Sequence, residues 1–597
     1  MTQPANVERP AGFRPVAGID HEQRSHPDRF GEVLTIVGPL AFAKPQALFG
    51  RQRVAADQQK TRYAQYGDSR QFPHRRKRTA HLLSVKPRHP KLTRRRRILT
   101  IECVTRRSGI EMDQAKTLGE LKQTGYRFRP VKDELRENLI TRLRSDQPIF
   151  AGLIGYENTV VPQMINGILA RHDLLLLGLR GQAKTRILRA LPELLDEWIP
   201  VVAEAEVWDD PLEPLFELTR RIIDRHGDDT EIRWVHRDER YREKLATPDV
   251  TIADLIGEVD LIKHAEGRHL ADESTMHFGL IPRSNRGIFA INELPDLPPR
   301  IQVGLFNVLE ERDVQIRGYP IRLNLDLLLV FSANPEDYTN RGRIVTPLKD
   351  RIGTVVRTHY PYSVAEAMRI TVENARLDRG HGQPPVDVPR FVHEVVEEMV
   401  RLARNSPHIN QQSGVSVRTS IAALEVVVAN AERRAIACDE PAIVPRVSDL
   451  DNVLAACRGK IELMLSEDEN AEDKLVTALI GEAVKNVSEN YFELHDLESV
   501  AAQFLGGKVT IEVGDDVPAA AVVENAGKIK GLMAAAKSLR KQATERRSDE
   551  GTKGSAGVPP ARENLHLASA VEFVLDTLHV HDKLSKFTYK ERTFYKR

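Results

Sequence analysis

The sequence predicts an α/β domain with a parallel sheet, followed by an all-α domain and further helices. Three observations predict this fold class. Apolar runs within 172–191, 286–294 and 325–335 end in turns or polar residues, as buried parallel strands do at the edge where such sheets bind ligands. A glycine-containing turn joins the first run to a helical pattern. After Pro361, apolar residues recur with the 3.6-residue period of helices.

The first apolar run is followed by a candidate phosphate-binding loop. Residues 178–185, GLRGQAKT, fit the pattern G-x-x-x-x-G-K-[ST] except that Ala183 replaces the second glycine. Backbone N–H groups of such a loop point at phosphate, while Lys184 and Thr185 contact phosphate and Mg²⁺. An ordinary strand-turn-helix with an accidental lysine fits this segment equally well, so other segments must decide.

The second apolar run, 286–294 or RGIFAINEL, ends in Asn292 and Glu293. In a phosphate-loop ATPase an aspartate at this place joins the Mg²⁺ shell, and a glutamate orients the attacking water. Glu293 fits the second role, whereas Asn292 replaces the aspartate. An amide oxygen still accepts a hydrogen bond but contributes no charge. The sequence therefore predicts weaker metal binding or slow turnover.

Two further segments end in polar residues suited to a nucleotide site. Residues 325–335, LDLLLVFSANP, present Ser332 and Asn334 at a strand end, where a polar side chain can contact the γ-phosphate or the attacking water. In 413–425, Ser416 is a predicted N-cap, so Arg418 lies in the first helical turn. An arginine is unfavourable there unless an anion offsets its charge.

Together these segments resemble the AAA+ ATPases, specifically the small ATPase subunit of magnesium chelatase and its MoxR-type chaperone relatives. The resemblance runs from about Ile149 to Leu465. It rests on six blocks in the family's order: LIGYE at 153–157, GLRGQAKT at 178–185, the segment 279–312, FSANPED at 331–337, LKDRIG at 348–353 and SVRTS at 416–420.

The resemblance implies a role for each matching residue. Glu293 would belong to the Walker B pair with Asn292, Asn334 would be sensor 1, Arg351 would be an arginine finger acting on a neighbouring subunit, and Arg418 would be sensor 2. The implied cofactors are ATP and Mg²⁺, with Mg²⁺ at Thr185 and, through water, at Asn292. The implied nucleotide-binding residues are Ile154, Gly155, Gly178, Leu179, Arg180, Gly181, Gln182, Ala183, Lys184 and Thr185.

Composition limits the number of domains, the cellular location and the role of the cysteines. The 597 residues, 41% of them hydrophobic, suffice for several domains. No apolar run approaches the roughly 20 residues that span a bilayer, and no secretory leader pattern is present, so we expect a cytoplasmic protein. Cys103, Cys438 and Cys457 are odd in number and far apart, which predicts neither a disulfide framework nor a cysteine metal site.

The first 110 residues differ in charge from the rest. They contain 23 Lys and Arg against 8 Asp and Glu, an excess of 15 in a chain of net charge +2, so the remainder carries −13. A nucleic-acid-binding arm is one interpretation. We favour a disordered extension, or sequence upstream of a true start at Met112, because no periodicity accompanies the charge.

The predicted domains follow from these patterns and the resemblance. They are a basic, disordered extension at 1–111, an α/β ATPase domain at 112–361 with an insertion at about 208–283, a helical lid at 362–466, a mainly helical extension at 467–542, a linker at 543–563, and a C-terminal helix with a basic aromatic tail at 564–597. Lid helices are predicted at 363–377, 389–404, 417–437 and 447–466.

Two regions leave alternatives open. The insertion resembles one that faces the pore or partner in chelatase-like proteins, but a solvated excursion would have the same composition. Its histidines, His264, His269 and His277, lack ligand spacing, so we expect no metal site there.

The C-terminal tail alternates Phe and Tyr with Lys and Arg, which suits single-stranded nucleic acid, peptide docking or an inert tail. We favour the inert tail.

The function predicted from the resemblance is a ring-forming ATPase, as a hexamer, that remodels a partner protein. We favour a MoxR-like chaperone acting with a von Willebrand A domain protein, because the Walker B motif is poor and the C-terminal part matches no known module. The alternatives are a true magnesium chelatase subunit inserting Mg²⁺ into a porphyrin, and a scaffold that senses nucleotide with little turnover. An enhancer-binding transcriptional regulator ranks last, since neither a GAFTGA-like loop nor a terminal helix-turn-helix pattern is found.

Overall fold

The computed structural model of the chain describes residues 115–260, 275–315, 322–335, 342–464, 470–506, 509–549, 560–589 and 592–597. The predicted basic extension at 1–111 lies outside these residues, as do His264 and His269 of the predicted insertion. Over the described ranges, no helix combines the length and apolar character that crossing a membrane requires.

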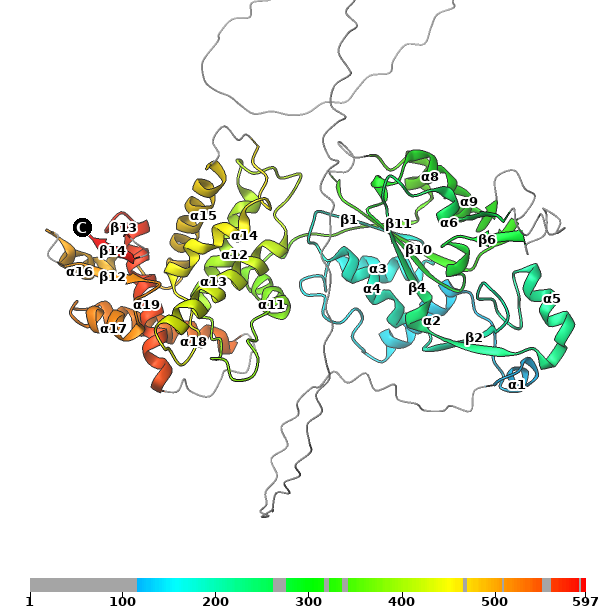
Figure 1. Ribbon diagram of the computed structural model, residues 1–597, viewed down its shortest axis with the longest axis horizontal. Helices are drawn as coiled ribbons and strands as arrows, with labels where there is room; N and C mark the ends of the chain where they lie inside the picture. Colours follow the sequence, from blue (N-terminus) through cyan, green and yellow to red (C-terminus); the bar gives the residue numbers. More distant parts are fainter. Residues whose placement is uncertain are drawn as a thin grey trace, which may run out of the picture. The chain divides into compact units, whose positions relative to one another are not determined.

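The α/β region is built on a sheet of five parallel strands in the order β11-β1-β10-β7-β4 (Figure 1). Parallel neighbours need crossover connections, which usually place helices on both faces of the sheet. The predicted α/β fold with a parallel sheet is therefore confirmed. The strands are β1 (Leu174–Leu177), β4 (Tyr241–Leu245), β7 (Gly287–Asn292), β10 (Leu327–Ala333) and β11 (Thr354–Arg357).

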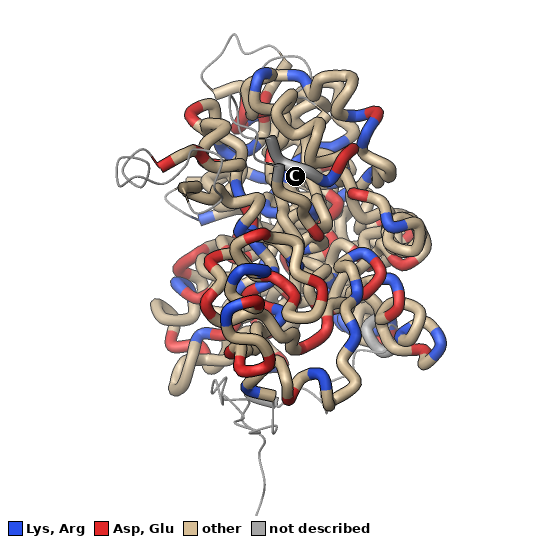
Figure 2. Tube along the Cα trace, turned by 90° about the vertical axis from the view of Figure 1, so that its right-hand side faces the viewer, with Lys and Arg blue, Asp and Glu red and all other residues tan. Residues whose placement is uncertain are grey.

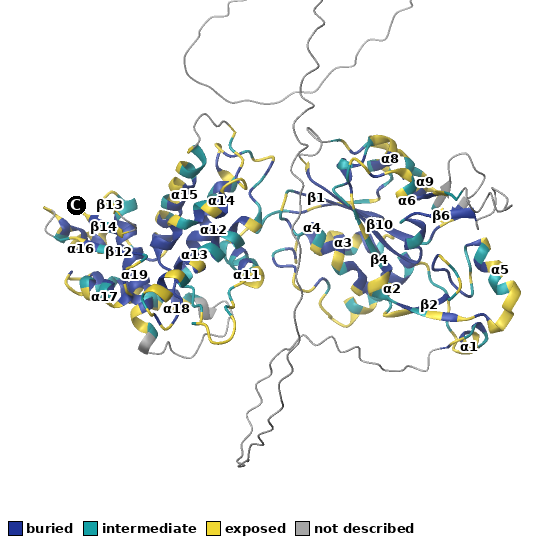
Figure 3. Ribbon diagram, viewed as in Figure 1, coloured by how far each residue is buried: buried dark blue, intermediate teal, exposed yellow. Residues whose placement is uncertain are grey.

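Successive side chains of the central strands enter two different cores. Leu174 and Leu176 of β1 pack into one core, and Leu175 packs into the other. All seven residues of β10 are buried, as Figure 3 shows for the strands at the centre of the sheet. The first core includes residues of α2 (Val131–Arg144), α3 (Val160–Leu169) and α4 (Lys184–Ala190), and the second includes residues of α8 (Pro299–Gly304) and α9 (Phe306–Glu310).

The predicted insertion at 208–283 is interrupted by a strand of the central sheet. β4 pairs in parallel with β7, with Tyr241 opposite Ile288. The sequence of β4, YREKL, reads as solvated because this edge strand leaves most of its side chains partly or fully exposed. Nearby elements are α1 (Leu118–Gln123), β2 (Trp198–Val202), α5 (Glu217–His226), β3 (Ile232–His236), α6 (Ile252–Leu255), β5 (Gly257–Val259) and β6 (Met276–Phe278).

Short elements complete the α/β region. β8 and β9 form an antiparallel pair between α9 and β10, and α10 precedes β11. The bounds are β8 (Asp313–Gln315), β9 (Arg322–Asn324) and α10 (Thr346–Arg351), with single 3-10 turns η1 (Leu191–Leu194), η2 (Gly227–Asp229), η3 (Arg237–Arg240), η5 (Pro282–Ser284) and η6 (Leu294–Asp296).

The region after β11 is helical, as the sequence predicts. Its first helices are α11 (Val364–Asn374), α12 (Arg390–Asn405) and α13 (Val417–Ala437). The helix predicted at 447–466 is different: a 3-10 segment η8 (Val447–Val453) continues into a short α14 (Leu454–Cys457). Gly459, with φ of +70°, follows this helix, and a left-handed glycine commonly ends a helix.

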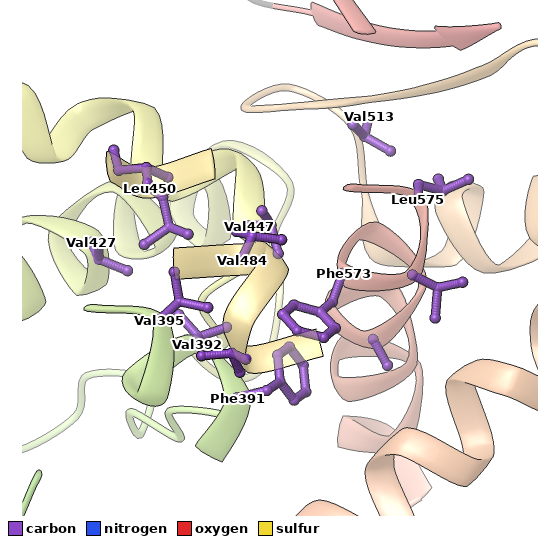
Figure 4. Packing of buried hydrophobic residues seen from close by; sticks show 14 of the residues in the cluster. Phe391, Val392, Val395, Val427, Val447, Leu450, Val484, Val513, Phe573 and Leu575 are labelled. Carbon is purple, nitrogen blue, oxygen red and sulfur yellow. The ribbon is translucent and has the colours of Figure 1, made fainter. Parts of the chain in front are cut away.

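The lid helices and the C-terminal residues share one hydrophobic core. It extends from Phe391 to Tyr595, and Figure 4 shows Phe391 of α12 beside Phe573 of α19, with ring centroids 4.8 Å apart. The predicted lid and C-terminal extension are therefore parts of one packed body. Its later elements are α15 (Ala471–Ser488), η9 (Leu494–Leu497), α16 (Glu498–Ala501), η10 (Ala502–Phe504), β12 (Ile511–Gly514), α17 (Ala519–Gly527), α18 (Leu532–Asp549) and α19 (Pro560–Val580).

Two predictions near the C-terminus need correction. Helix α18 continues to Asp549 and α19 begins at Pro560, so most of the predicted linker at 543–563 is either helical or outside the described residues. The predicted tail contains two strands, β13 (Ser585–Tyr589) and β14 (Arg592–Lys596), which join β12 in an antiparallel sheet. The interpretation as an inert tail is wrong, because Tyr595 of β14 is buried in the shared core.

Lys and Arg alternate with Asp and Glu along the chain trace in Figure 2. Mixed signs of this kind are usual for a surface in contact with solvent. On β14, Arg592 donates to both Asp516 and Glu512, so this cation of the predicted basic tail is paired within the chain.

We expect Tyr595→Phe to lower the free energy of unfolding by about 1 to 3 kcal/mol, because the variant removes a hydrogen-bond donor from a buried carboxylate. The Tyr595 hydroxyl donates to Asp576 Oδ1 at 2.6 Å. Urea denaturation monitored by circular dichroism measures the change. The control is Tyr589→Phe on neighbouring β13, where the side chain is 63% exposed and a change below about 0.5 kcal/mol is expected. Equal effects of the two variants would contradict a buried β14.

Candidate functional site

The phosphate loop, residues 178–185, connects the end of β1 to the start of α4. Two of its glycines occupy places where no side chain fits. A Cβ on Gly178 would lie 1.9 Å from Thr358 Oγ1, and a Cβ on Gly181 would lie 2.1 Å from Ser416 Oγ. The loop backbone therefore packs closely against the segment after β11 on one side and the N-cap of α13 on the other.

Ala183, which replaces the motif's second glycine, has left-handed backbone dihedrals of φ 53° and ψ 17°. This conformation costs a non-glycine residue about 1 to 2 kcal/mol. The loop thus adopts a backbone that glycine would adopt without that steric cost. Strain of this kind is concentrated at functional sites, where the surrounding contacts hold it.

Lys184 lies at the centre of the site and is 7% exposed. Its ammonium donates to the carbonyl oxygens of Gly178 at 2.5 Å and Leu179 at 3.0 Å, and to Asn334 Oδ1 at 2.5 Å. A buried charge needs such acceptors because it has lost its water. Two of these bonds lie within the phosphate loop, and the third joins the loop to Asn334, the residue that follows β10.

The predicted sensor and the predicted catalytic carboxylate are in direct contact. The Asn334 amide donates from Nδ2 to Glu293 Oε2 at 2.7 Å, while its Oδ1 accepts from Lys184. A continuous hydrogen-bond chain therefore runs from Lys184 through Asn334 to Glu293. These three residues follow β1, β10 and β7, which are neighbours in the sheet.

Ser332 holds the end of β7 beside β10. Its hydroxyl donates to Asn292 Oδ1 at 3.0 Å and accepts from the backbone N–H of Glu293 at 3.3 Å. Glu293 has left-handed dihedrals of φ 57° and ψ 48°, a second strained non-glycine residue in the site. The chain therefore turns at Glu293, directly after β7, and leaves the line of the strand.

The two side chains predicted to bind Mg²⁺ are uncharged. The side chains predicted to hold the ion are the Thr185 hydroxyl and the Asn292 amide, and the latter's oxygen already accepts from Ser332. Among the described residues, no group of three His, Cys, Asp or Glu side chains is arranged to hold a metal. The side chains fit Mg²⁺ only as part of a nucleotide complex, in which phosphate oxygens supply most of the charge.

Arg418 projects from the start of α13, which lies against the phosphate loop through Ser416 and Gly181. Ser416 caps the helix as predicted, because its hydroxyl accepts from the backbone N–H of Arg418 at 3.1 Å. The Arg418 side chain is exposed. Within the part of the chain that the structure describes, it makes no hydrogen bond or ion pair, so its charge is free to meet an anion.

Arg351 lies at the end of α10 and packs on α9. Its guanidinium donates to Glu310 Oε2 at 2.6 Å and stands 4.9 Å from the centre of the Phe306 ring. The guanidinium is thus directed to α9 rather than to Lys184 or Asn334. The predicted finger therefore belongs to a separate cluster from the hydrogen-bond chain of the site.

A small, partly open cleft adjoins the phosphate loop. Ile154 lines this cleft, whereas Gly155 is not among its lining residues. Gly155 has φ of +79°, and a Cβ at this position would lie 3.4 Å from the Glu366 carboxylate. The walls are mostly apolar and come from both sides of the lid junction: Leu153, Ile154, Pro361, Ile370 and Val417.

Sequence reasoning missed the residues that brace the loop from behind. The Tyr156 hydroxyl lies 2.9 Å from the carbonyl oxygen of Gln182 and 2.8 Å from that of His359, and burial raises its pKa. Thr358 donates to Gln182 Oε1 at 2.8 Å. The available signal is the polar run THY directly after β11, because polar residues after β7 and β10 also belong to the site.

Comparison with known proteins gives one family match. Residues 234–355 match the family model described as the Sigma-54 interaction domain. The matched range contains β7 and β10 with Glu293 and Asn334, together with Arg351, but it excludes the phosphate loop and Arg418.

Two solved structures are similar at low identity. A model of the complex between subunits BchI and BchD of magnesium chelatase has 20% identity, coverage of 53% of this chain and 97% of that chain, and a TM-score of 0.29. NtrX from Brucella abortus in complex with ADP has 14% identity, coverage of 68% and 72%, and a TM-score of 0.28. Likenesses at this level carry no argument about function.

We expect Ala183→Gly to raise the free energy of unfolding by about 0.5 to 1 kcal/mol, because relief of the left-handed strain exceeds the entropy cost of glycine. The matched control is Ala190→Gly on α4, where φ is −87° and a loss of about 1 kcal/mol is expected. Chemical denaturation of both variants measures the difference. A loss at position 183 as large as that at 190 would show that the loop is not held in this conformation.

Proposed function

We propose that this chain, which contains an AAA+ ATPase domain, binds ATP with Mg²⁺ at the phosphate loop and hydrolyses it. The observation that carries the proposal is the hydrogen-bond chain from Lys184 through Asn334 to Glu293. It brings together a cation suited to the phosphates and a carboxylate suited to the attacking water. The alternative is that Lys184 only stabilises the loop by donating to its two carbonyl oxygens. That alternative does not explain why Asn334 also holds the Glu293 carboxylate at the same edge of the sheet.

Each group then has a chemical task. Lys184 and the loop N–H groups would bind the β- and γ-phosphates, with Thr185 beside them for the metal. Glu293 would orient and polarise a water molecule in line with the γ-phosphate, and Asn334 would fix that carboxylate. Arg418, exposed at the junction with the lid, would offset phosphate charge. The apolar cleft beside Ile154 would take the base.

Thr185 and, through water, Asn292 would hold Mg²⁺, which would supply positive charge at the phosphates. Asn292 contributes no charge to this shell, and its oxygen accepts from Ser332. We therefore propose slow turnover relative to a site that carries aspartate at this position. We expect Asn292→Asp to raise Mg²⁺ affinity, because it adds the missing carboxylate.

We propose further that the subunits form a ring, as a hexamer, in which Arg351 acts on the ATP of a neighbour. The support is the resemblance of the block LKDRIG and the place of Arg351 in a different cluster from the residues of its own phosphate loop. The alternative is a structural arginine that only pairs with a surface acid, as Arg351 does with Glu310 on α9. An arginine at the transferring phosphate stabilises developing charge. Glu310 would hold the guanidinium until the neighbouring nucleotide competes for it.

We propose that the chain uses ATP to remodel a partner protein in the cytoplasm. Asn292 in the Walker B pair and a C-terminal part that matches no known module favour a MoxR-like chaperone acting with a von Willebrand A domain protein, with a genuine magnesium chelatase subunit as the alternative. Purification of the chain with candidate von Willebrand A domain proteins, with and without ATP, tests this part. ATP-dependent association supports the chaperone, whereas ATP-dependent Mg²⁺ insertion into protoporphyrin supports the chelatase.

A nucleotide-sensing scaffold is the second candidate function. The observation that favours it is the neutral Mg²⁺ shell, since Asn292 replaces a carboxylate and is already bonded to Ser332. Such a protein would bind ATP through Lys184 without appreciable turnover. It differs from the first proposal only in the rate of hydrolysis, which the next experiment measures.

We expect Lys184→Ala to weaken ATP binding about 100-fold, because it removes a charged donor from the phosphates. Glu293→Gln should keep ATP binding and stop hydrolysis, since the carboxylate acts on water in the transition state. Lys122→Ala, an exposed lysine on α1, is the control for loss of one positive charge. Equilibrium binding and phosphate release measure the two effects. If wild type releases phosphate no faster than Glu293→Gln, the scaffold replaces the ATPase.

We expect a mixture of Lys184→Ala and Arg351→Ala proteins to recover activity that neither has alone. The first still carries a finger and the second still carries a phosphate loop, so a mixed ring contains some complete sites. Phosphate release should rise with total protein concentration. Inactivity of the mixture under conditions where subunits exchange would show that Arg351 is not supplied by a neighbour.

A further inference from the structure

Tyr360 touches both the phosphate loop and the lid. It lies shortly after β11, and its hydroxyl donates to the carbonyl oxygen of Arg180 in the loop at 2.9 Å. On the lid side, a Cβ on Gly414 would lie 2.7 Å from the same hydroxyl and 3.0 Å from Leu179 Cδ1. The hydroxyl therefore fills the space between the loop and the turn that precedes α13.

Arg404 of α12 covers the ring of Tyr360. Its guanidinium carbon is 4.2 Å from the ring centroid, and Nε donates to the carbonyl oxygen of Val415 at 3.0 Å. Within the described residues, its buried Nη2 has no hydrogen-bond partner, and burial lowers the pKa of this guanidinium. A cation that has lost water and a hydrogen bond depends strongly on the aromatic face.

These contacts form a closed path around the lid side of the phosphate loop. The path leads from the Arg180 carbonyl to Tyr360, then to Arg404 and Val415. Val415 directly precedes Ser416, whose hydroxyl packs against Gly181 of the same loop and caps the helix that carries Arg418. A shift of the Arg180 carbonyl, or of Gly181, therefore acts on the first turn of α13 from two sides.

We propose that Tyr360 and Arg404 are positioning residues that set Arg418 relative to the phosphate loop and so let the lid distinguish ATP from ADP. The inference rests on the proposed nucleotide site and adds how its γ-phosphate is read. Binding of a γ-phosphate would rearrange the loop backbone, and the tyrosine hydroxyl, hydrogen-bonded to that backbone, passes the change to the turn before α13. Neither residue needs to touch the nucleotide.

The test measures the dissociation constants of ATP and ADP in the Glu293→Gln protein, so that ATP is not consumed. Tyr360→Phe, added to this protein, removes the hydroxyl and keeps the ring for Arg404. We expect it to reduce the preference for ATP over ADP about 5-fold, the effect of one hydrogen bond. Tyr362→Phe, at a tyrosine two residues away that is 72% exposed, is the matched control and should leave the preference unchanged.

A double-mutant cycle with Arg418→Ala separates positioning from simple support. If Tyr360 acts through Arg418, Tyr360→Phe changes the ATP preference only when Arg418 is present. At position 404, Arg404→Lys should keep part of the preference through its charge over the ring, whereas Arg404→Met should lose it. Effects of Tyr360→Phe that are equal for both nucleotides, or that add fully to those of Arg418→Ala, overturn the inference.

Failure of the inference is distinguishable from failure of the proposed function. If Lys184→Ala leaves ATP binding intact, the nucleotide site itself is wrong. If ATP binding depends on Lys184 but Tyr360→Phe leaves the ratio of the two dissociation constants unchanged, only the role of Tyr360 and Arg404 is wrong. The melting temperature of every variant is measured without nucleotide, so that a variant that fails to fold is recognised.

Discussion

The candidate site depends on one buried charge, the ammonium of Lys184. Removal of an ammonium from water is costly unless it is hydrogen-bonded, and here two loop carbonyls and the Asn334 amide accept from it. Since these acceptors come from two neighbouring strands, the ammonium fixes the phosphate loop to the end of β10. The orientation of Asn334 follows, because one end of its amide accepts from Lys184 and the other donates to Glu293.

The lid belongs to a larger body than the sequence indicates. One core joins α12 and α13 to α19 and β14, so the first turn of α13 is anchored in a packed unit that includes the C-terminal strands. Displacement of that turn by the phosphate loop would therefore be resisted, or transmitted, by the whole body.

The central part of the site could be predicted from the sequence because Lys184, Glu293 and Asn334 come after the buried strands β1, β7 and β10. The motif at 178–185 and the polar ends of β7 and β10 are local patterns, and the parallel sheet brings them together. Tyr360 and Arg404 could not be predicted, since their contact depends on the meeting of a loop and a helix far apart in the sequence. The role of Arg351 rests on the resemblance of the block LKDRIG, and its pairing with Glu310 has no sequence signal.

The fold was less predictable where pairing is non-local. β4 reads as a charged surface segment because it is an edge strand, and only its pairing with β7 assigns it to the sheet. β14 pairs with β12, whose residues are about 80 positions earlier, so nothing near the predicted tail indicates a strand. Alternating Phe and Lys has the same pattern whether one face is buried or both are solvated.

The central claim is that ATP binds where Lys184, Asn334 and Glu293 meet. A structure of the Glu293→Gln protein determined with Mg²⁺ and ATP tests it most directly. We expect the β- and γ-phosphates within hydrogen-bond distance of the Lys184 ammonium, with Asn334 and the substituted side chain at position 293 facing the γ-phosphate. A nucleotide found elsewhere, or phosphates out of reach of Lys184 while the loop carbonyls keep its hydrogen bonds, would contradict the account.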